Sequence, residues 1–181
     1  MSSLVKEIFE PVKSFYAMRK NRKSELFTFI LLPVIIGITL FVLEIFLTPI
    51  REVNIEEFSN DLLNILITVL TLFVSFSMAY LSIIVTSDSK SINIMKETKS
   101  KYYCIGLNQC TLYQVLTTDI TYTLVLEIIF LLFTFFQKFL VYMVNDLGIK
   151  ILIAVNMALI VHVFILLMLT IKNIYLAFWQ G

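Results

Sequence analysis

Long apolar runs separated by short polar segments dominate the chain. The runs occupy residues 26–48, 62–86, 115–143 and 150–174. Each is long enough to cross a bilayer, because roughly 20 helical residues with a rise of about 1.5 Å each span a hydrocarbon core of roughly 30 Å. The pattern predicts an all-α, polytopic membrane protein with four transmembrane helices.

The last two runs predict a helical hairpin around a short polar turn at residues 145–148. The helix before this turn can extend from Leu112 to Val144, which is longer than a bilayer core, so we expect its first turns to project into the cytoplasm. In the first run, Pro33 removes a backbone hydrogen bond and should bend the helix. A neighbouring helix must then satisfy the freed carbonyl.

Composition supports a membrane protein and excludes a soluble globular one. Hydrophobic residues make up 59% and charged residues 15% of the chain, and the mean hydropathy is +0.92. Globular proteins average roughly 45–50% apolar and 25% charged residues. The two longest polar segments, residues 1–25 and the loop 87–111, are too short for a catalytic domain. Residues 26–181 therefore form the transmembrane domain.

Positive charge is unevenly distributed between the two sides of the predicted membrane. Of the fourteen Lys and Arg residues, six lie in the amino-terminal segment, four in the 87–111 loop and one in the tail, against three in the two opposite loops. By the positive-inside rule, both termini and the 87–111 loop are cytoplasmic. We expect a multi-pass protein of a bacterial inner membrane.

The first 25 residues predict an amphipathic helix, because apolar positions recur at helical spacing among basic ones. Such a helix suits the headgroup layer of anionic lipids, or it can pack on the protein's own cytoplasmic face. Pro11 is expected to break or bend it. The basic residues that it offers to lipid or to a partner are Arg19, Lys20, Arg22 and Lys23.

The 87–111 loop is the best candidate for a docking surface. We expect a short helix around Ser91 to Lys101 and a turn at residues 106–108. Its lysines can face either a cytoplasmic protein or lipid phosphates. They are Lys90, Lys96, Lys99 and Lys101.

One face of the second predicted span carries small and polar residues. Their spacing alternates between three and four residues, which places them on one stripe of a helix. Such a stripe favours close packing against another helix, and the alternative is that it lines a water-filled path in an oligomer. The stripe consists of Asn64, Thr68, Thr71, Ser75 and Ser82, with Met78 in the same register.

Polar residues inside the other spans predict contacts between helices at matching depth. In an antiparallel hairpin, Asp119 should lie level with residues 172–174, and Lys138 level with Asn156. We expect Asp119 to form an ion pair with Lys172 near the inner interface, and Glu44 can pair with Lys138 near the outer one. Pairing lowers the cost of inserting both charges into the membrane.

Glu127 and His162 lie nearest the middle of the membrane. The same register offsets them by about one helical turn of 5.4 Å, so that a contact is allowed but not required. They can relay protons, bind a cation or form a buried hydrogen bond. The alternative is that His162 is a satisfied packing residue.

No pattern in the chain points to catalysis, to a metal or to a cofactor. A single histidine has no second ligand at helical spacing, and glycine-rich phosphate loops and nucleophile motifs are missing. Cys104 and Cys110 are too widely spaced for a zinc or redox motif, and their predicted cytoplasmic position favours reduced thiols.

The layout of the chain resembles a known family. Four spans in 181 residues, the lead SLVKEIFEPVKSFYAMRKNRK and the loop SDSKSINIMKETKSKYYCIG are similar to the membrane subunit of the Kiwa anti-phage defence system. The resemblance implies a homo-oligomer of the bacterial inner membrane that responds to phage attack and binds a cytoplasmic, DNA-associated partner subunit. It assigns no role to individual residues.

These patterns favour a non-enzymatic, oligomeric membrane subunit, such as a tetramer, that senses membrane perturbation or anchors a cytoplasmic effector protein. Anionic lipids are further expected partners, and direct nucleic-acid binding is not expected. The alternative is a small proton- or ion-coupled transporter or channel that uses Glu127 and His162.

Overall fold

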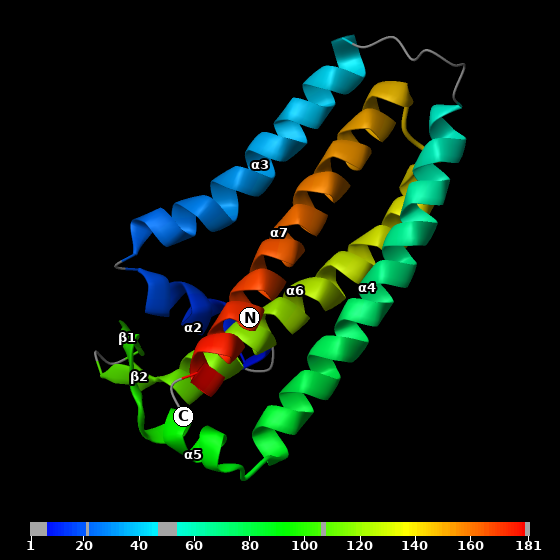
Figure 1. Cartoon of the computed structure of the whole chain (residues 1–181). Coiled ribbons are helices and arrows are strands. Elements are labelled where there is room, and N and C mark those ends of the chain that lie inside the picture. Colours follow the sequence, from blue (N-terminus) through cyan, green and yellow to red (C-terminus); the bar gives the residue numbers. More distant parts are fainter. Residues whose placement is uncertain (1–6, 21, 47–53, 106–107, 180–181) are drawn as a thin grey trace.

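The structure is a computed structural model that describes residues 7–20, 22–46, 54–105 and 108–179, apart from the side chains of residue 23 and of residues 176–179. Four long helices form its body (Figure 1): α3 (Lys23–Phe46), α4 (Ile55–Thr86), α6 (Leu112–Leu140) and α7 (Asp146–Trp179). All four are long and apolar enough to cross a membrane. The prediction of a helical protein with four candidate spans is confirmed.

Side-chain caps fix where these helices begin. Thr111 accepts a hydrogen bond from the backbone of Gln114, whose side chain in turn accepts from the backbone of Thr111, so α6 starts with a capping box. Asn54 caps α4 more simply, because its side chain accepts from the backbone N–H groups of Glu56 and Glu57. Asn145 Oδ1 accepts from the backbone N–H of Gly148 at 3.0 Å. Because Asn145 caps α7, the polar residues 146–148 belong to its first turn, and the chain reverses before them rather than at them.

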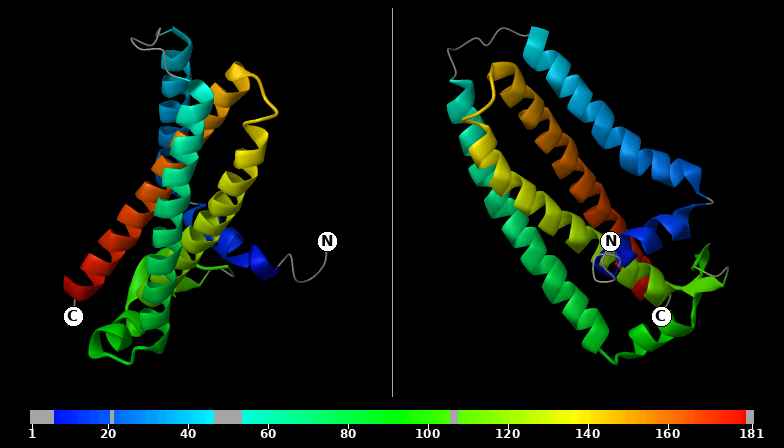
Figure 2. Two further views of the ribbon diagram at one scale, coloured as in Figure 1. Left: turned by 90° about the vertical axis from the view of Figure 1, so that its right-hand side faces the viewer. Right: turned by 180° about the vertical axis from the view of Figure 1, so that it is seen from behind.

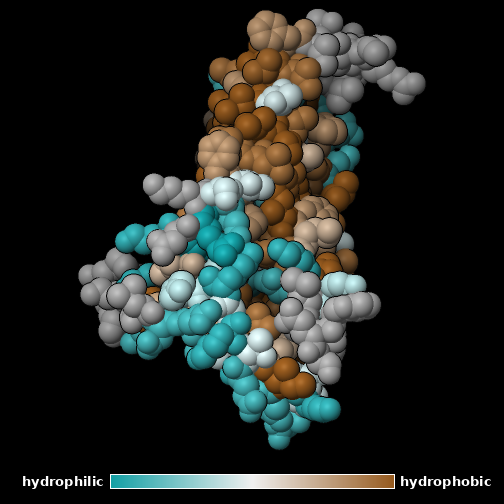
Figure 3. Space-filling model, turned by 60° about the vertical axis from the view of Figure 1, so that its left-hand side comes forward, coloured by the Kyte–Doolittle hydropathy of each residue, from teal (hydrophilic) through white to brown (hydrophobic). Residues whose placement is uncertain are grey.

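Three short elements gather at the end of the bundle where α3 and α6 begin (Figure 2). They are α2 (Glu10–Arg19), α5 (Lys90–Glu97) and a hairpin of β1 (Lys99–Tyr103) and β2 (Gln109–Thr111). We call these elements together the polar head. Figure 3 shows hydrophilic residues concentrated at this end and mostly hydrophobic residues over the rest of the coloured surface.

The hairpin is the element that the sequence did not predict. The expected helix at residues 91–101 ends at Glu97, and Lys99 pairs with Thr111 in an antiparallel register. Exposed and buried positions alternate along β1, with Ser100 and Tyr102 facing inward, which is the period of a strand rather than of a helix. The turn expected at residues 106–108 lies partly outside the described residues.

The centre of the bundle is a cluster of apolar side chains from α4, α6 and α7, built around Leu70, Phe130 and Val163. The fourth helix, α3, packs against α7 through small residues. A Cβ placed on Gly37 would lie 3.0 Å from Ala158 Cβ and 3.1 Å from the carbonyl oxygen of Ala154. Gly37 therefore permits a close approach of α3 and α7, as small residues do between membrane helices.

The polar head is fixed to the bundle by apolar contacts. Ile84 at the end of α4, Met95 of α5 and Leu116 of α6 share one cluster. The ring of Phe15 in α2 stacks on Tyr122 of α6 with centroids 3.9 Å apart. Pro11 lies in the first turn of α2, and a turn at Phe9 separates α2 from the helical residues 7 and 8, so the expected break lies just before Pro11. The described part of the lead thus packs on the protein itself.

Candidate functional site

The head and the bundle meet at a buried ion pair. Arg19 Nη2 donates to Asp119 Oδ1 at 2.7 Å, and the two side chains are 0% and 1% exposed. Asn173 Nδ2 of α7 donates to Asp119 Oδ2 at 2.8 Å. The expected pair of Asp119 with Lys172 is wrong, because Lys172 is exposed and the neighbouring Asn173 faces the carboxylate.

A second group of polar residues continues from this ion pair to the surface. The Arg19 guanidinium lies 5.3 Å from the centre of the Tyr102 ring, and the Tyr102 hydroxyl donates to Glu25 Oε2 at 3.0 Å. Burial, together with the charge and hydrogen bond of Glu25, raises the pKa of the Tyr102 hydroxyl to about 12. Tyr102 thus stays protonated at neutral pH and holds the hairpin to the start of α3.

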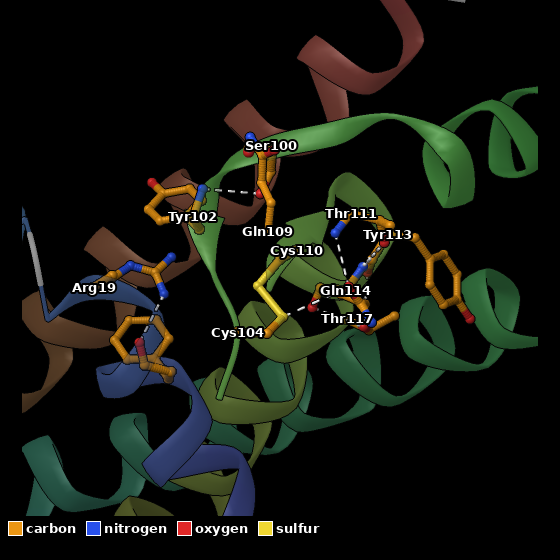
Figure 4. The surroundings of a disulfide bond; sticks show 11 residues. Arg19, Ser100, Tyr102, Cys104, Gln109, Cys110, Thr111, Tyr113, Gln114 and Thr117 are labelled. Atoms are coloured by element: carbon orange, nitrogen blue, oxygen red, sulfur yellow. Dashed lines mark hydrogen bonds between the residues drawn. A yellow bond between two sulfur atoms is a disulfide. The ribbon is translucent and has the colours of Figure 1, made fainter. Parts of the chain in front are cut away.

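A disulfide joins Cys104 to Cys110 beside this cluster (Figure 4). The expectation of reduced thiols is wrong for this structure, because the hairpin brings the two Cα atoms to 5.2 Å, within the range of a disulfide. Cys110 is buried against Met18, Tyr102 and Val115. The prediction of reduced thiols used only the expected cellular compartment, which does not show that the fold brings these two cysteines together.

The head exposes charges of both signs, and its exposed positive charges are lysines. Lys20, Lys90, Lys96, Lys99 and Lys101 are all exposed, whereas Arg19 is buried and cannot dock a partner. Arg22 is half-buried and donates to Glu25 Oε1 at 3.0 Å. The side chain of Lys23 lies outside the described residues. The predicted docking surface therefore narrows to the lysines of α5 and β1, with Lys20.

Three polar contacts join helices toward the opposite end of the bundle. Gln137 and Asn156 exchange two hydrogen bonds, of 3.0 and 2.6 Å, between α6 and α7. Lys138, expected at this position, instead donates to Asn64 Oδ1 of α4. Glu44 does not pair with Lys138. The backbone carbonyl of Glu44 instead accepts from Lys150 Nζ at 3.0 Å.

His162 satisfies a carbonyl that Pro33 leaves free. In a regular helix the N–H of residue 33 would bond the carbonyl of Phe29, but proline has no N–H. His162 Nδ1 lies 2.8 Å from that oxygen. Because a carbonyl only accepts, Nδ1 carries a proton, and in the neutral ring Nε2 accepts from the Tyr122 hydroxyl at 3.5 Å.

Glu127 lies on a different side of the core. Its side chain is 0% exposed, and Oε1 accepts from Ser77 Oγ at 3.2 Å. Oε2 is buried without a hydrogen-bond partner. The bonds of Glu127 and His162 thus go to separate partners. Ser77 lies off the polar stripe of α4, so no pattern in the sequence indicated that it would face the core.

Most of the polar stripe of α4 faces away from the bundle. Asn64, Thr68, Thr71, Ser75 and Ser82 are all exposed, and Asn64 also accepts from Lys138 of α6, so the expected packing of the stripe against another helix is not made by most of it within this chain. Thr68, Thr71 and Ser75 donate to the carbonyl four residues earlier, at 2.7 to 3.0 Å. Because these hydroxyls are satisfied within α4, the stripe can face lipid or another protein.

Within the described residues, no group of three or more His, Cys, Asp or Glu side chains is placed to hold a metal ion. The buried polar groups are joined mainly to other elements of the fold, some between helices of the bundle and some between the head and the bundle. Comparison of the chain with protein-family models, with curated proteins and with solved structures found no match.

Proposed function

We propose that this protein is a non-enzymatic subunit of a bacterial inner membrane whose polar head docks a cytoplasmic protein. The observation that carries the proposal is a set of exposed lysines on a head that is joined by buried contacts to the bundle of four long helices. Lys90 and Lys96 come from α5, and Lys99 and Lys101 from β1. Both termini and the head lie on the cytoplasmic side, as the distribution of positive charge favours.

The attachment of the head supports an anchoring role. The Arg19–Asp119 pair, the Phe15–Tyr122 stack and the Tyr102–Glu25 hydrogen bond connect the head to α3 and α6. A surface fixed in this way binds without the entropic cost of ordering a loop. Its positive charge suits an acidic protein surface, and anionic lipid is the competing ligand.

The test is affinity purification from native membranes with quantitative mass spectrometry. We compare the parent with a variant in which Lys90, Lys96, Lys99 and Lys101 are replaced by Gln, and with the surface control Glu56→Gln with Glu57→Gln at the far end. The proposal expects one soluble protein to co-purify with the parent and the control and to be lost from the lysine variant. Equal recovery in all three, or retention of lipid alone, would count against it.

We further propose that copies of the chain associate through the exposed stripe of α4. Small and hydroxyl residues at a lipid-facing surface allow close helix approach in membrane oligomers. In a background with Cys104→Ser and Cys110→Ser, Thr71→Cys should form disulfide-linked dimers on mild oxidation. Ile38→Cys on the exposed face of α3 should not. Dimers from both positions or from neither would remove α4 from the interface.

The resemblance in layout suggests a role in anti-phage defence. The test is the plating efficiency of phage on cells that carry the parent or the lysine variant together with the neighbouring genes.

A second candidate function is ion-coupled transport, which rests on the buried carboxyl of Glu127 with one unpartnered oxygen. Flux into liposomes that is equal for the parent and Glu127→Gln would remove Glu127 from such a mechanism.

A further inference from the structure

A cavity lies between α4, α6 and α7 in the half of the bundle nearest the polar head. Its volume is about 250 Å³, and its walls are mostly apolar, with Tyr80, Ile120 and Leu167 among them. An engineered cavity of about 150 Å³ with similar apolar walls binds benzene. The present cavity therefore has room for a ring or for a short hydrocarbon chain with a polar end.

The rim of the cavity is turned toward the bilayer. Phe76 of α4 is 69% exposed and Ile171 of α7 is 58% exposed, and both line the cavity. The two helices are among those with the length and composition to span a membrane. A molecule dissolved in the acyl layer can reach the cavity sideways between α4 and α7 without crossing the polar head.

Four hydroxyl residues, Ser77, Tyr80, Thr123 and Thr170, line this otherwise apolar space, and Thr170 is the one whose hydroxyl is buried without a partner. Ser77 Oγ uses its hydrogen on Glu127 Oε1, at 3.2 Å, and Thr123 Oγ1 uses its hydrogen on the carbonyl of Asp119, at 2.8 Å. Thr170 is 7% exposed, and its Oγ1 is buried without a hydrogen bond. A buried hydroxyl without a partner is costly in an apolar environment.

We propose that this cavity binds a small lipophilic alcohol or phenol that enters from the bilayer, with its hydroxyl on Thr170 and its apolar body among the side chains of α4, α6 and α7. A ligand hydroxyl can both donate and accept, so it satisfies Thr170 in either direction. A charged ligand does not fit, because no ionised group lines the cavity and a charge at membrane depth is expensive. The site is separate from the lysines of the polar head and does not rest on the function proposed for them.

The test is photolabelling of the full chain in lipid nanodiscs with a diazirine analogue of octanol, mapped by mass spectrometry. We expect saturable adducts on cavity residues of α4, α6 and α7 that excess octanol displaces. Thr170→Val keeps the shape of the side chain and removes its hydroxyl, and it should weaken binding roughly twofold to tenfold, the worth of one hydrogen bond. Ile171→Trp changes only an exposed rim position and should abolish saturable labelling by closing the mouth.

Matched controls separate binding from folding. Thr134→Val removes a buried hydroxyl that already donates to the carbonyl of Phe130 and does not line the cavity, and Met168→Trp adds a ring to an exposed position of α7 outside it. Neither should change labelling. Adducts spread evenly over lipid-facing residues, or a saturable signal that Ile171→Trp leaves intact, would overturn the proposal. A signal that falls with Ile171→Trp but not with Thr170→Val would overturn the assignment of an alcohol or phenol.

Discussion

His162 donates from Nδ1 to the backbone carbonyl of Phe29 at 2.8 Å, across 133 positions in the sequence. Phe29 stands four residues before Pro33, so its carbonyl has no donor within α3. One imidazole on α7 therefore supplies the hydrogen bond that a proline removes from α3. This relationship accounts for the single histidine of the chain without a catalytic or ion-conducting role.

Replacement of His162 by Leu should leave the Phe29 carbonyl buried and unsatisfied. The expected loss in the free energy of unfolding is about 1–3 kcal/mol, which titration with SDS in mixed micelles can measure. Pro33→Ala restores an N–H within α3, so the loss should largely disappear in the double variant. As a control, Pro33→Ala should not rescue Asn156→Leu, because Asn156 bonds Gln137 rather than α3. An equal loss from His162→Leu in both backgrounds would contradict the account.

Asp119→Ala should destabilise the protein more than any surface change in the head. It leaves the Arg19 guanidinium buried without its partner, at a cost of about 3–5 kcal/mol. The double variant Arg19→Met with Asp119→Leu should recover most of that loss, because no charge then remains buried. Lys172→Gln is the matched control and should be neutral, since Lys172 is exposed. A loss from Lys172→Gln as large as that from Asp119→Ala would restore the ion pair that the sequence suggested.

The Cys104–Cys110 disulfide should be present in protein that is purified without reductant. Alkylation with a maleimide followed by mass spectrometry should add no label before reduction and two labels after it. Replacement of both cysteines by Ser should lower the stability of the hairpin by about 2 kcal/mol, in the usual range for a disulfide. Two labels without reduction would show free thiols. Because disulfides are rare in the cytosol, the same measurement in intact cells reports the redox environment of the head.

Gly37→Leu should separate α3 from α7. The space beside Gly37 is already filled by Ala154 and Ala158, so a large side chain forces the backbones apart at a cost of about 1–3 kcal/mol. Gly37→Ala should cost less, and Ile45→Leu at an exposed position of α3 should change little. Thermal unfolding in detergent, followed by size exclusion, measures the order of stability of these variants. Unchanged stability of Gly37→Leu would mean that α3 does not pack closely at this point.

The four helices and the depth of their polar residues followed from the apolar pattern, but the rotation of each helix did not. Asp119 lies level with residues 172–174, as an antiparallel hairpin requires, yet its partner is Asn173 rather than Lys172. Likewise Asn156 meets Gln137 rather than Lys138. Each error is one residue, which is a turn of about 100° around a helix. The depth of a residue in the membrane depends only on its distance along the chain from the turn. The direction in which its side chain points depends on how the helices pack.

Other features depended on contacts that no local pattern contains. Arg19 resembled its basic neighbours in the sequence, and only the fold places it beside Asp119, 100 positions away. The spacing of polar residues in α4 predicted one polar face, but it did not predict whether that face points toward the core or away from it. In lipid a hydroxyl that bonds its own backbone need not point inward, so polarity alone does not locate the core.

The arrangement of the chain across the membrane tests the account most directly. In a background with Cys104→Ser and Cys110→Ser, single cysteines at Lys96 in α5 and at Asp146, the first residue of α7, are treated with a membrane-impermeant maleimide in spheroplasts. The account predicts that Asp146→Cys reacts from the periplasm and that Lys96→Cys reacts only after the inner membrane is permeabilised. Reaction of Lys96→Cys from the periplasm, or of both positions from the same side, would contradict it.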